Sequence, residues 1–263
     1  VFMPVGTRGA IRSLTTDALG QLAAADRTRV EVMLGNTYHL MLRPGAETVA
    51  ALGGLHRFTG WDGHLLTDSG GYQVFSLTPK LTDDGVVFRS TYDGDQHLFT
   101  PESAVAVQEL LGADIQMVLD VCAALPSDRR VLSDAVERTA QWAARARTAH
   151  RRTDDQALFG IVQGGDLPDL RVESARRTVE LDFDGYAIGG LSVGETRDVM
   201  LPALAAALGE LPADQPRYLM GVGDPASIVE AVGLGVDLFD CVLPSRHARH
   251  GTVLTGSGRL MIK

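Results

Sequence analysis

Cysteine is scarce in this sequence, which has only Cys122 and Cys241 among its 263 residues. Two isolated cysteines offer no disulfide framework and no metal-ligand spacing, and they suit a reducing compartment. The sequence also lacks an apolar run of the roughly 20 residues that span a bilayer, and it does not open with a signal-peptide pattern. We therefore expect a cytoplasmic protein with no membrane association.

Positive charge is not in excess either. The net charge of −9 argues against indiscriminate binding of nucleic acids. Residues 241–263, however, contain no Asp or Glu, and their cationic side chains are Arg246, Arg249, Arg259 and Lys263. His247 and His250 add positive charge below neutral pH. Such a patch on an acidic body steers a polyanion to one face; the alternative is a solvated, charged tail.

Eight short apolar segments recur along the chain, each followed by a polar or glycine-rich turn: 1–6, 30–34, 65–67, 115–119, 158–162, 186–188, 217–220 and 236–239. Helical patterns separate most of them, at 16–25, 101–112, 133–151, 168–181, 197–210 and 225–233. Apolar strands that alternate with helices indicate a parallel sheet covered on both faces. We predict an α/β protein with a single (β/α)₈ TIM-barrel domain over residues 1–263; a doubly wound sheet is the alternative.

Two segments depart from this repeat. Residues 86–99, around Asp93-Gly94, have the pattern of a β-hairpin inserted after the third strand. Residues 252–262, around Gly256-Ser257-Gly258, predict a second hairpin after the eighth strand. Because no eighth helical pattern follows, we expect the barrel not to close within these residues.

Polar residues follow several of the predicted strands at the point where each strand ends. In a TIM barrel these ends share one face, so the following residues are expected to converge: Asp68, Asp120, Gln163, Gly190, Met220 and Asp240. Carboxylates accept hydrogen bonds from ring N–H groups, and glycines expose backbone N–H and C=O groups. The set therefore suits a polar, planar ligand, and Asp240 is placed as a nucleophile beside a phosphate-binding strip.

Each of these residues also has a purely structural interpretation. An aspartate at a strand end is more often a helix N-cap than a catalyst, and paired glycines such as Gly70-Gly71 occur in ordinary turns. Met220 could simply pack inside the barrel. Tyr72 could be a core aromatic or a stacking platform, and Cys122 could be a small buried residue rather than a functional thiol. The combination favours a functional site more than any single residue does.

Four blocks of the sequence resemble the signature blocks of one known family, the tRNA-guanine transglycosylases. The blocks are Leu34-Gly35-Asn36-Thr37-Tyr38-His39-Leu40, Leu66-Thr67-Asp68-Ser69-Gly70-Gly71-Tyr72-Gln73-Val74, Gly189-Gly190-Leu191-Ser192-Val193-Gly194-Glu195 and Phe239-Asp240-Cys241-Val242-Leu243-Pro244. They follow one another in the family's order across almost the whole chain. Several long blocks in the right order are far more specific than one glycine motif.

The resemblance implies replacement of guanine at the anticodon wobble position of tRNA by a 7-deazaguanine. It assigns Asp240 as the nucleophile that attacks C1′ of the ribose, and Asp68 as the proton acceptor. The implied base-binding residues are Ser69, Gly70, Gly71, Tyr72, Asp120, Gln163, Gly190, Leu191 and Met220. The implied RNA-binding residues are Gly221, Val222, Gly223, Asp224, Pro225, Ala226 and Ser227, followed by Ser245, Arg246, His247, Ala248 and Arg249.

Two further segments, outside the four blocks, refine these expectations. Cys122 stands two residues after Asp120, as in the bacterial enzymes, where the eukaryotic catalytic subunit has Val; this favours 7-aminomethyl-7-deazaguanine as the incoming base. Ser-Arg-His-Ala-Arg-His-Gly stands where Thr-Arg-Asn-Ala-Arg-Asn-Gly is common, and it keeps both arginines.

The chain also differs from full-length members of this family. They bind structural zinc through a C-terminal Cys-x-Cys-x₂-Cys and a later His, near the contacts of their homodimer. This sequence stops at Lys263, before that region, and begins with Val1 rather than Met. We expect it to be truncated at both ends and to bind no cofactor, with zinc present only in a longer form.

Two other functions compete with base exchange. A retaining glycoside hydrolase could use Asp68 and Asp240 as its carboxylate pair, but it would be expected to carry aromatic sugar platforms, and the chain has only two Trp. A non-catalytic, tRNA-binding partner subunit would be expected to lose the nucleophile or the pocket aspartate. Because Asp68, Asp120 and Asp240 are all present, the sequence favours the enzyme.

Overall fold

The computed structural model describes residues 1–26, 30–77 and 79–262, apart from the side chains of residues 22–26. Lys263, counted above among the basic residues, lies outside the described residues. None of the described helices combines the length and apolar character that a bilayer crossing requires.

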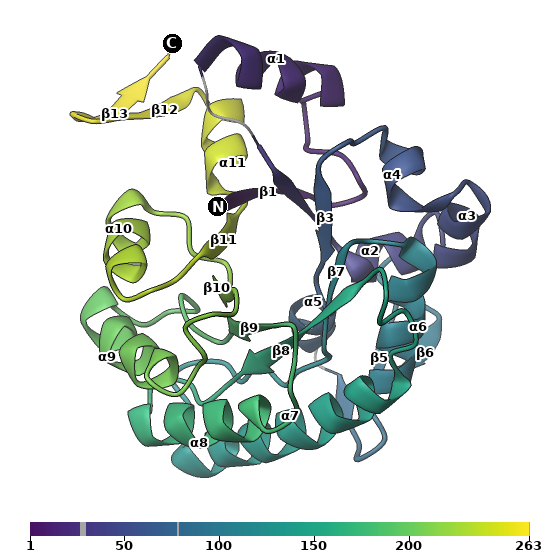
Figure 1. The fold of residues 1–263 in the computed structure, drawn as a ribbon, viewed down its shortest axis with the longest axis vertical. Helices are drawn as coiled ribbons and strands as arrows, with labels where there is room; N and C mark the ends of the chain where they lie inside the picture. The colour runs from purple at the N-terminus through teal and green to yellow at the C-terminus, as the bar shows by residue number, and fades with distance from the viewer. Residues whose placement is uncertain (27–29, 78, 263) are drawn as a thin grey trace.

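Eight parallel strands form a closed barrel at the centre of the molecule (Figure 1). They are β1 (Phe2–Gly6), β2 (Val32–Gly35), β3 (His64–Thr67), β7 (Ile115–Met117), β8 (Ala157–Val162), β9 (Gly185–Ile188), β10 (Arg217–Leu219) and β11 (Leu238–Cys241). Each of the eight predicted strands is present within a few residues of its expected place. The predicted TIM barrel is therefore confirmed.

The expectation that the barrel stays open was wrong. Strand β1 pairs with β11, and Phe2, Met3 and Pro4 lie opposite Phe239, Asp240 and Cys241. Closure depends on the backbone hydrogen bonds between the first and last strands, which do not require a helix after the last strand. A short helix, α11 (Leu243–Arg249), does follow β11, so the expectation that no helix follows the last strand was wrong as well.

The helices surround the barrel, as Figure 1 shows, and most connect one strand to the next. They are α1 (Thr16–Asp26), α2 (Thr37–Leu42), α3 (Ala46–Ala51), α4 (Gly54–Thr59), α5 (Gly71–Phe75), α6 (Pro101–Leu111), α7 (Arg129–Ala149), α8 (Pro168–Val179), α9 (Arg197–Leu208), α10 (Pro225–Gly233) and α11 (Leu243–Arg249). Helix α7 buries Leu132, Val136, Thr139 and Ala143 at helical spacing. The short helices α2, α4, α5 and α11 were not predicted, because a helix of five to seven residues has almost no periodicity to detect.

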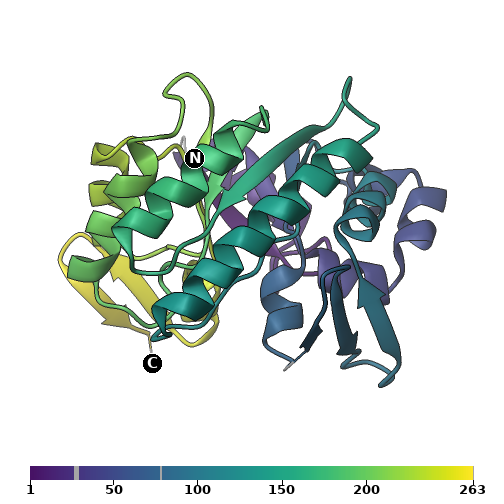
Figure 2. The same cartoon turned by 90° about the horizontal axis from the view of Figure 1, so that it is seen from below.

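Two small antiparallel sheets extend from the barrel. One contains β4 (Lys80–Leu81), β5 (Val86–Arg89) and β6 (Gln96–Phe99), and the other contains β12 (Thr252–Thr255) and β13 (Gly258–Met261). Both predicted hairpins are confirmed, and the first has the additional strand β4. Figure 2 shows both sheets at one end of the barrel, opposite the N-terminus. They flank the end at which the barrel strands terminate.

At the other end, where the strands begin, aspartate side chains bind backbone N–H groups of the neighbouring strand. Asp114 accepts a hydrogen bond from the Leu65 N–H at 2.7 Å. Asp184 and Asp237 accept from backbone N–H groups of β8 and β10, each at 2.9 Å. Each carboxylate precedes one strand and binds the adjacent strand, so it supplies a partner for an otherwise unpaired donor.

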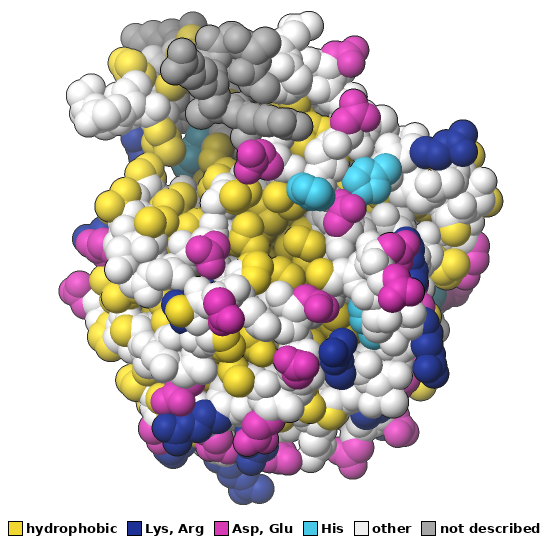
Figure 3. All heavy atoms as spheres, in the orientation of Figure 1, with side chains coloured by type: hydrophobic (Ala, Val, Ile, Leu, Met, Phe, Trp, Pro, Cys, Tyr) yellow, Lys and Arg dark blue, Asp and Glu magenta, His cyan; other side chains and the backbone are white. Residues whose placement is uncertain are grey.

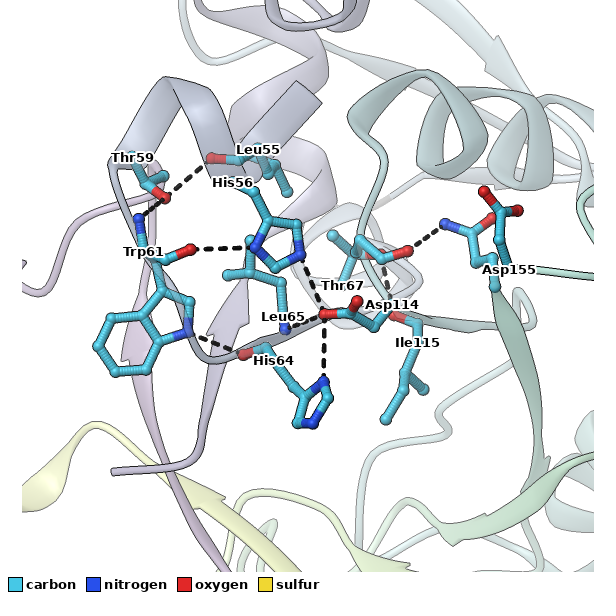
Figure 4. Close-up of polar contacts among 12 residues, drawn as sticks. Leu55, His56, Thr59, Trp61, His64, Leu65, Thr67, Asp114, Ile115 and Asp155 are labelled. Atoms are coloured by element: carbon cyan, nitrogen blue, oxygen red, sulfur yellow. Dashed lines mark hydrogen bonds and ion pairs between the residues drawn. The ribbon is translucent and has the colours of Figure 1, made fainter. Parts of the chain in front are cut away.

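The Asp114 carboxylate also lies close to two histidines (Figure 4). Its Oδ2 atom is 3.1 Å from Nε2 of His56 and 3.7 Å from Nδ1 of His64, and the Trp61 indole N–H donates to the His64 carbonyl at 3.0 Å. The face on which the strands begin carries acidic side chains around a hydrophobic centre, with Lys and Arg mostly toward its edge (Figure 3). This charge distribution disfavours a polyanion there.

Candidate active site

A cavity of about 310 Å³ opens where the barrel strands end. The predicted catalytic and base-binding residues that line it are Asp68, Ser69, Gly70, Tyr72, Asp120, Gly190, Leu191, Met220 and Asp240. Gly71 and Gln163 lie immediately behind this lining: a Cβ atom on Gly71 would be 3.1 Å from Asp120 Oδ1, and Gln163 is buried. The structure therefore brings together residues that are scattered over most of the sequence.

Asp240 projects from β11 with its two carboxylate oxygens in different surroundings. Oδ1 accepts a hydrogen bond from the Tyr218 hydroxyl at 2.6 Å and another from the Gly221 N–H at 2.7 Å. Oδ2 has no hydrogen-bond partner among the described residues, and Asp240 lines the cavity. One oxygen thus holds the side chain in place, and the other is available to react.

Asp68 follows β3 and is held by the loop that follows β2. Its Oδ1 accepts from the Thr37 N–H at 2.8 Å and the Gly70 N–H at 3.2 Å, and its Oδ2 accepts from the Asn36 amide at 2.6 Å. Burial raises the pKa of Asp68 to about 7, even though these N–H groups oppose the rise. The charges of Asp240 and Asp120 contribute to this rise, after burial. Asp68 can therefore hold or release a proton near neutral pH.

Asp120 is fixed by two neighbouring side chains. The Ser69 hydroxyl donates to Oδ1 at 3.2 Å, and the Gln163 amide donates to Oδ2 at 2.6 Å. Burial raises the pKa of Asp120, while Gln163 and Ser69 favour the ionised form. Each oxygen can accept a further hydrogen bond, so the carboxylate is positioned to bind N–H groups of a planar ligand.

Gly190 has a backbone conformation that favours glycine. Its φ is +64°, and a Cβ atom would lie only 2.3 Å from Gln163 Oε1. The adjacent backbone is held by Arg171, a fully buried side chain of α8. Its guanidinium donates to the carbonyls of Gly189 at 2.7 Å and Gly190 at 3.0 Å, and it also binds the carbonyls of Val162 and Gly165. Arg171 thus ties together the loops that follow β8 and β9.

Three ambiguous residues now have a defined place. Tyr72 is 63% exposed beside the cavity, so the core interpretation of this side chain was wrong. Met220 lines the cavity and also packs against the barrel core. Cys122 lines the cavity as well, but burial raises the pKa of its thiol to about 12. It therefore remains protonated and is not a nucleophilic thiolate.

The predicted RNA-binding residues fall in two segments. Ser245, Arg246, His247, Ala248 and Arg249 form most of α11, which directly follows the strand of Asp240; Arg246 and Arg249 are exposed. In the second segment, Gly221, Asp224, Pro225 and Ala226 are exposed, whereas Val222, Gly223 and Ser227 are buried. The Asp224 side chain accepts a hydrogen bond from the Ser227 N–H and begins α10. Burial keeps the Val222 and Ser227 side chains away from the surface.

Asn36, Tyr218 and Arg171 organise this site but were not among the predicted site residues. Asn36 directly follows β2, so the same strand-end argument that selected Asp68 could have identified it. Tyr218 lies within an apolar strand and resembles a core aromatic. Arg171 lies on a helix with Arg176 and Arg177, and only burial distinguishes it from these surface residues.

The described residues do not fit a zinc site. Among them there is no group of three or more His, Cys, Asp or Glu side chains placed to hold a metal ion. Cys241 is buried and Cys122 lines the cavity, and both are free thiols.

The pKa of Asp240 predicts how this site affects stability. Burial raises that pKa, so the native state holds the proton at a pH where the unfolded chain has released it. The resulting stabilisation is complete below the unfolded pKa and is lost as pH rises through the folded pKa. We expect Asp240→Asn, which stays neutral, to raise Tm by at least about 2 °C at neutral pH and by less in acid. The exposed Asp214→Asn is the control, and a Tm gain independent of pH would contradict the prediction.

Comparison with known proteins agrees with this geometry. The whole chain, residues 1–263, matches a family model described as Queuine tRNA-ribosyltransferase. Over its full length the chain is 55% identical to the queuine tRNA-ribosyltransferase of Desulforudis audaxviator and 52% identical to that of Caldanaerobacter subterraneus, and it covers 70% and 69% of these proteins. The resemblance drawn from the four sequence blocks is thereby confirmed, and this chain belongs to the queuine tRNA-ribosyltransferase family.

Proposed function

We propose that this protein is a tRNA-guanine transglycosylase of queuosine biosynthesis. It exchanges guanine at the anticodon wobble position of tRNA for a 7-deazaguanine base. The observation that carries this proposal is the Asp240 carboxylate, which has one anchored oxygen and one oxygen without a hydrogen-bond partner among the described residues. It shares a cavity with two further carboxylates, Asp68 and Asp120. We also propose a cytoplasmic location and a homodimer for this protein.

In the first step, Asp240 Oδ2 attacks C1′ of the ribose. A C1′–O bond forms, the C1′–N9 bond breaks, and guanine leaves with the bonding electron pair. The Tyr218 O–H and the Gly221 N–H both donate to Oδ1, so they orient the carboxylate for this attack. Burial and the Asp240 charge raise the pKa of Tyr218 well above its usual value, which keeps the phenol protonated as a donor.

Asp68 supplies the proton transfers at the exchanging base. In the first step the departing guanine gains a proton. In the second step N9 of the incoming base loses its proton and attacks C1′. The new C1′–N9 bond replaces the bond between C1′ and Asp240. A single carboxyl group can serve both steps if its pKa lies near the working pH. The pKa of Asp68, raised to about 7 by burial, meets this requirement.

The rest of the cavity recognises the base. Asp120 accepts hydrogen bonds from N–H groups at the edge of the base. Gly190, beside the Gln163 amide, presents its backbone polar groups to the base. The exposed ring of Tyr72 stacks on one face of the base, and Met220 contacts the other. The remaining contacts come from the lining residues Ser69, Gly70 and Leu191 and from Gly71 behind them.

The tRNA lies over the end of the barrel at which the strands terminate. A nucleotide in the anticodon loop is easier to splay out than a paired one, so it can enter the cavity. Arg246 and Arg249 on α11 then bind phosphates beside it. The exposed residues of the loop before α10 contact the neighbouring RNA.

The variant Asp240→Asn tests this function directly. It retains an oxygen that can accept from Tyr218 and Gly221 but lacks the anionic nucleophile. We expect incorporation of labelled guanine into tRNA to fall by at least about 10³-fold, while tRNA affinity stays within a few-fold of wild type. Exchange at the wild-type rate would disprove the role of Asp240, and no exchange by the wild-type protein would disprove the proposed function.

The incoming base is proposed to be 7-aminomethyl-7-deazaguanine. Cys122, the residue that favours it, lines the cavity close to Asp120, where it can contact the 7-substituent. In a competition for tRNA, we expect the protein to incorporate this base in preference to queuine. Preference for queuine would contradict this assignment and leave the exchange reaction itself unaffected.

A further inference from the structure

Arg8, His39, Arg43 and Tyr92 form a side-chain cluster outside the cavity, here called the Tyr92 cluster. Nη2 of Arg8 donates to the Tyr92 hydroxyl at 2.7 Å, and this hydroxyl lies 2.8 Å from Nδ1 of His39. Burial lowers the pKa of His39, and the charge of Arg8 has a smaller effect in the same direction. Its ring is therefore neutral at pH 7, and Nδ1 can accept the Tyr92 proton. The hydroxyl thus has a defined partner on each side.

Both arginines of the cluster lie against the Tyr92 ring. The guanidinium carbons of Arg8 and Arg43 are 5.1 Å and 5.4 Å from its centroid, within the roughly 6 Å range of cation–π interactions. Both side chains are exposed. The tyrosine therefore brings two guanidinium groups together on an otherwise acidic protein, against their mutual repulsion.

Neither arginine of the cluster forms an ion pair with a carboxylate among the described side chains. Arginines on the outer helices commonly do, as shown by Arg129, Arg145, Arg176 and Arg197. Asp93, next to Tyr92, instead accepts a hydrogen bond from the Asp95 N–H. The positive charge of the cluster is therefore not neutralised within the described part of the protein.

The Tyr92 cluster lies on the same rim of the barrel as α11. Strand β1 lies between β11 and β2, so the segments that follow these three strands are neighbours. The segment after β11 carries Arg246 and Arg249. The segment after β1 carries Arg8, and the segment after β2 carries Arg43. Asn36, which binds Asp68, caps the helix that contains His39, so the cluster begins one helical turn from the cavity.

We propose that the Tyr92 cluster binds a backbone phosphate of the tRNA whose target nucleotide occupies the cavity. Arg8 uses one N–H for Tyr92, and its remaining donors, with those of Arg43, suit phosphate oxygens. This site extends the phosphate contacts of α11 around the rim, on the far side of β1. The inference rests on the proposed function, because it requires RNA on this end of the barrel.

The alternative is that the cluster only attaches the β5–β6 turn to the barrel. In that case the loss of either arginine would lower thermal stability and leave the electrostatics of RNA binding unchanged. The salt dependence of binding separates the two roles, because each phosphate contact releases counterions.

The test measures the affinity for unmodified tRNA over a range of salt concentrations. We expect Arg8→Ala and Arg43→Ala each to weaken binding on the order of tenfold. Each should also reduce the slope of log K against log salt by about 0.7 to 1. Tyr92→Phe should weaken binding by less and keep the slope, because both cations remain. The KM for free guanine should not change in any of these variants.

Arg151→Ala is the matched control, because Arg151 is an exposed arginine near the end of the barrel where the strands begin; its slope should equal that of wild type. Slopes of Arg8→Ala and Arg43→Ala that match this control, with wild-type exchange intact, would overturn the phosphate site. A lower Tm with an unchanged slope would also overturn it, since it would show a purely structural role. If the wild-type protein neither binds tRNA nor exchanges guanine, the proposed function fails instead.

Discussion

The burial of three carboxylates at one end of the barrel is the constraint on which the rest of the site depends. Burial raises the pKa of Asp68, Asp120 and Asp240, and backbone or side-chain donors oppose that rise at each residue. The donors come from several strands and loops, so the closed barrel is what brings them together. The site stores unfavourable electrostatic energy that a fully formed fold must offset. The same energy makes Asp240 reactive and Asp68 able to exchange a proton near neutrality.

Charged side chains have different roles at the two ends of the barrel. Where the strands begin, Asp114 and Asp184 bind backbone N–H groups of neighbouring strands, and their role is structural. Where the strands end, exposed arginines such as Arg8 and Arg246 lie on segments that follow β1 and β11. A protein with a net charge of −9 can therefore still guide a polyanion to one end.

The sequence predicted the fold well because long helices and continuous apolar strands have strong periodic signals. It failed for barrel closure, which depends on the pairing of β1 with β11 across the whole chain. The strand-end rule placed Asp68, Asp120 and Asp240 in one cavity. It missed Tyr218, since a tyrosine within an apolar strand resembles core until its hydroxyl is seen 2.6 Å from Asp240. It missed Arg8 as well. Arg8 follows β1, and only the pairing of β1 with β11 brings it to the same rim as α11.

The covalent bond between Asp240 and the ribose is the central claim of this account. The most direct measurement is mass spectrometry of the protein after incubation with unmodified tRNA, denaturation and nuclease digestion. The account predicts a ribose adduct on the peptide that contains Asp240, absent from Asp240→Asn and discharged by added guanine. Base exchange by the wild-type protein without an adduct at Asp240, or with an adduct on another residue, would contradict it.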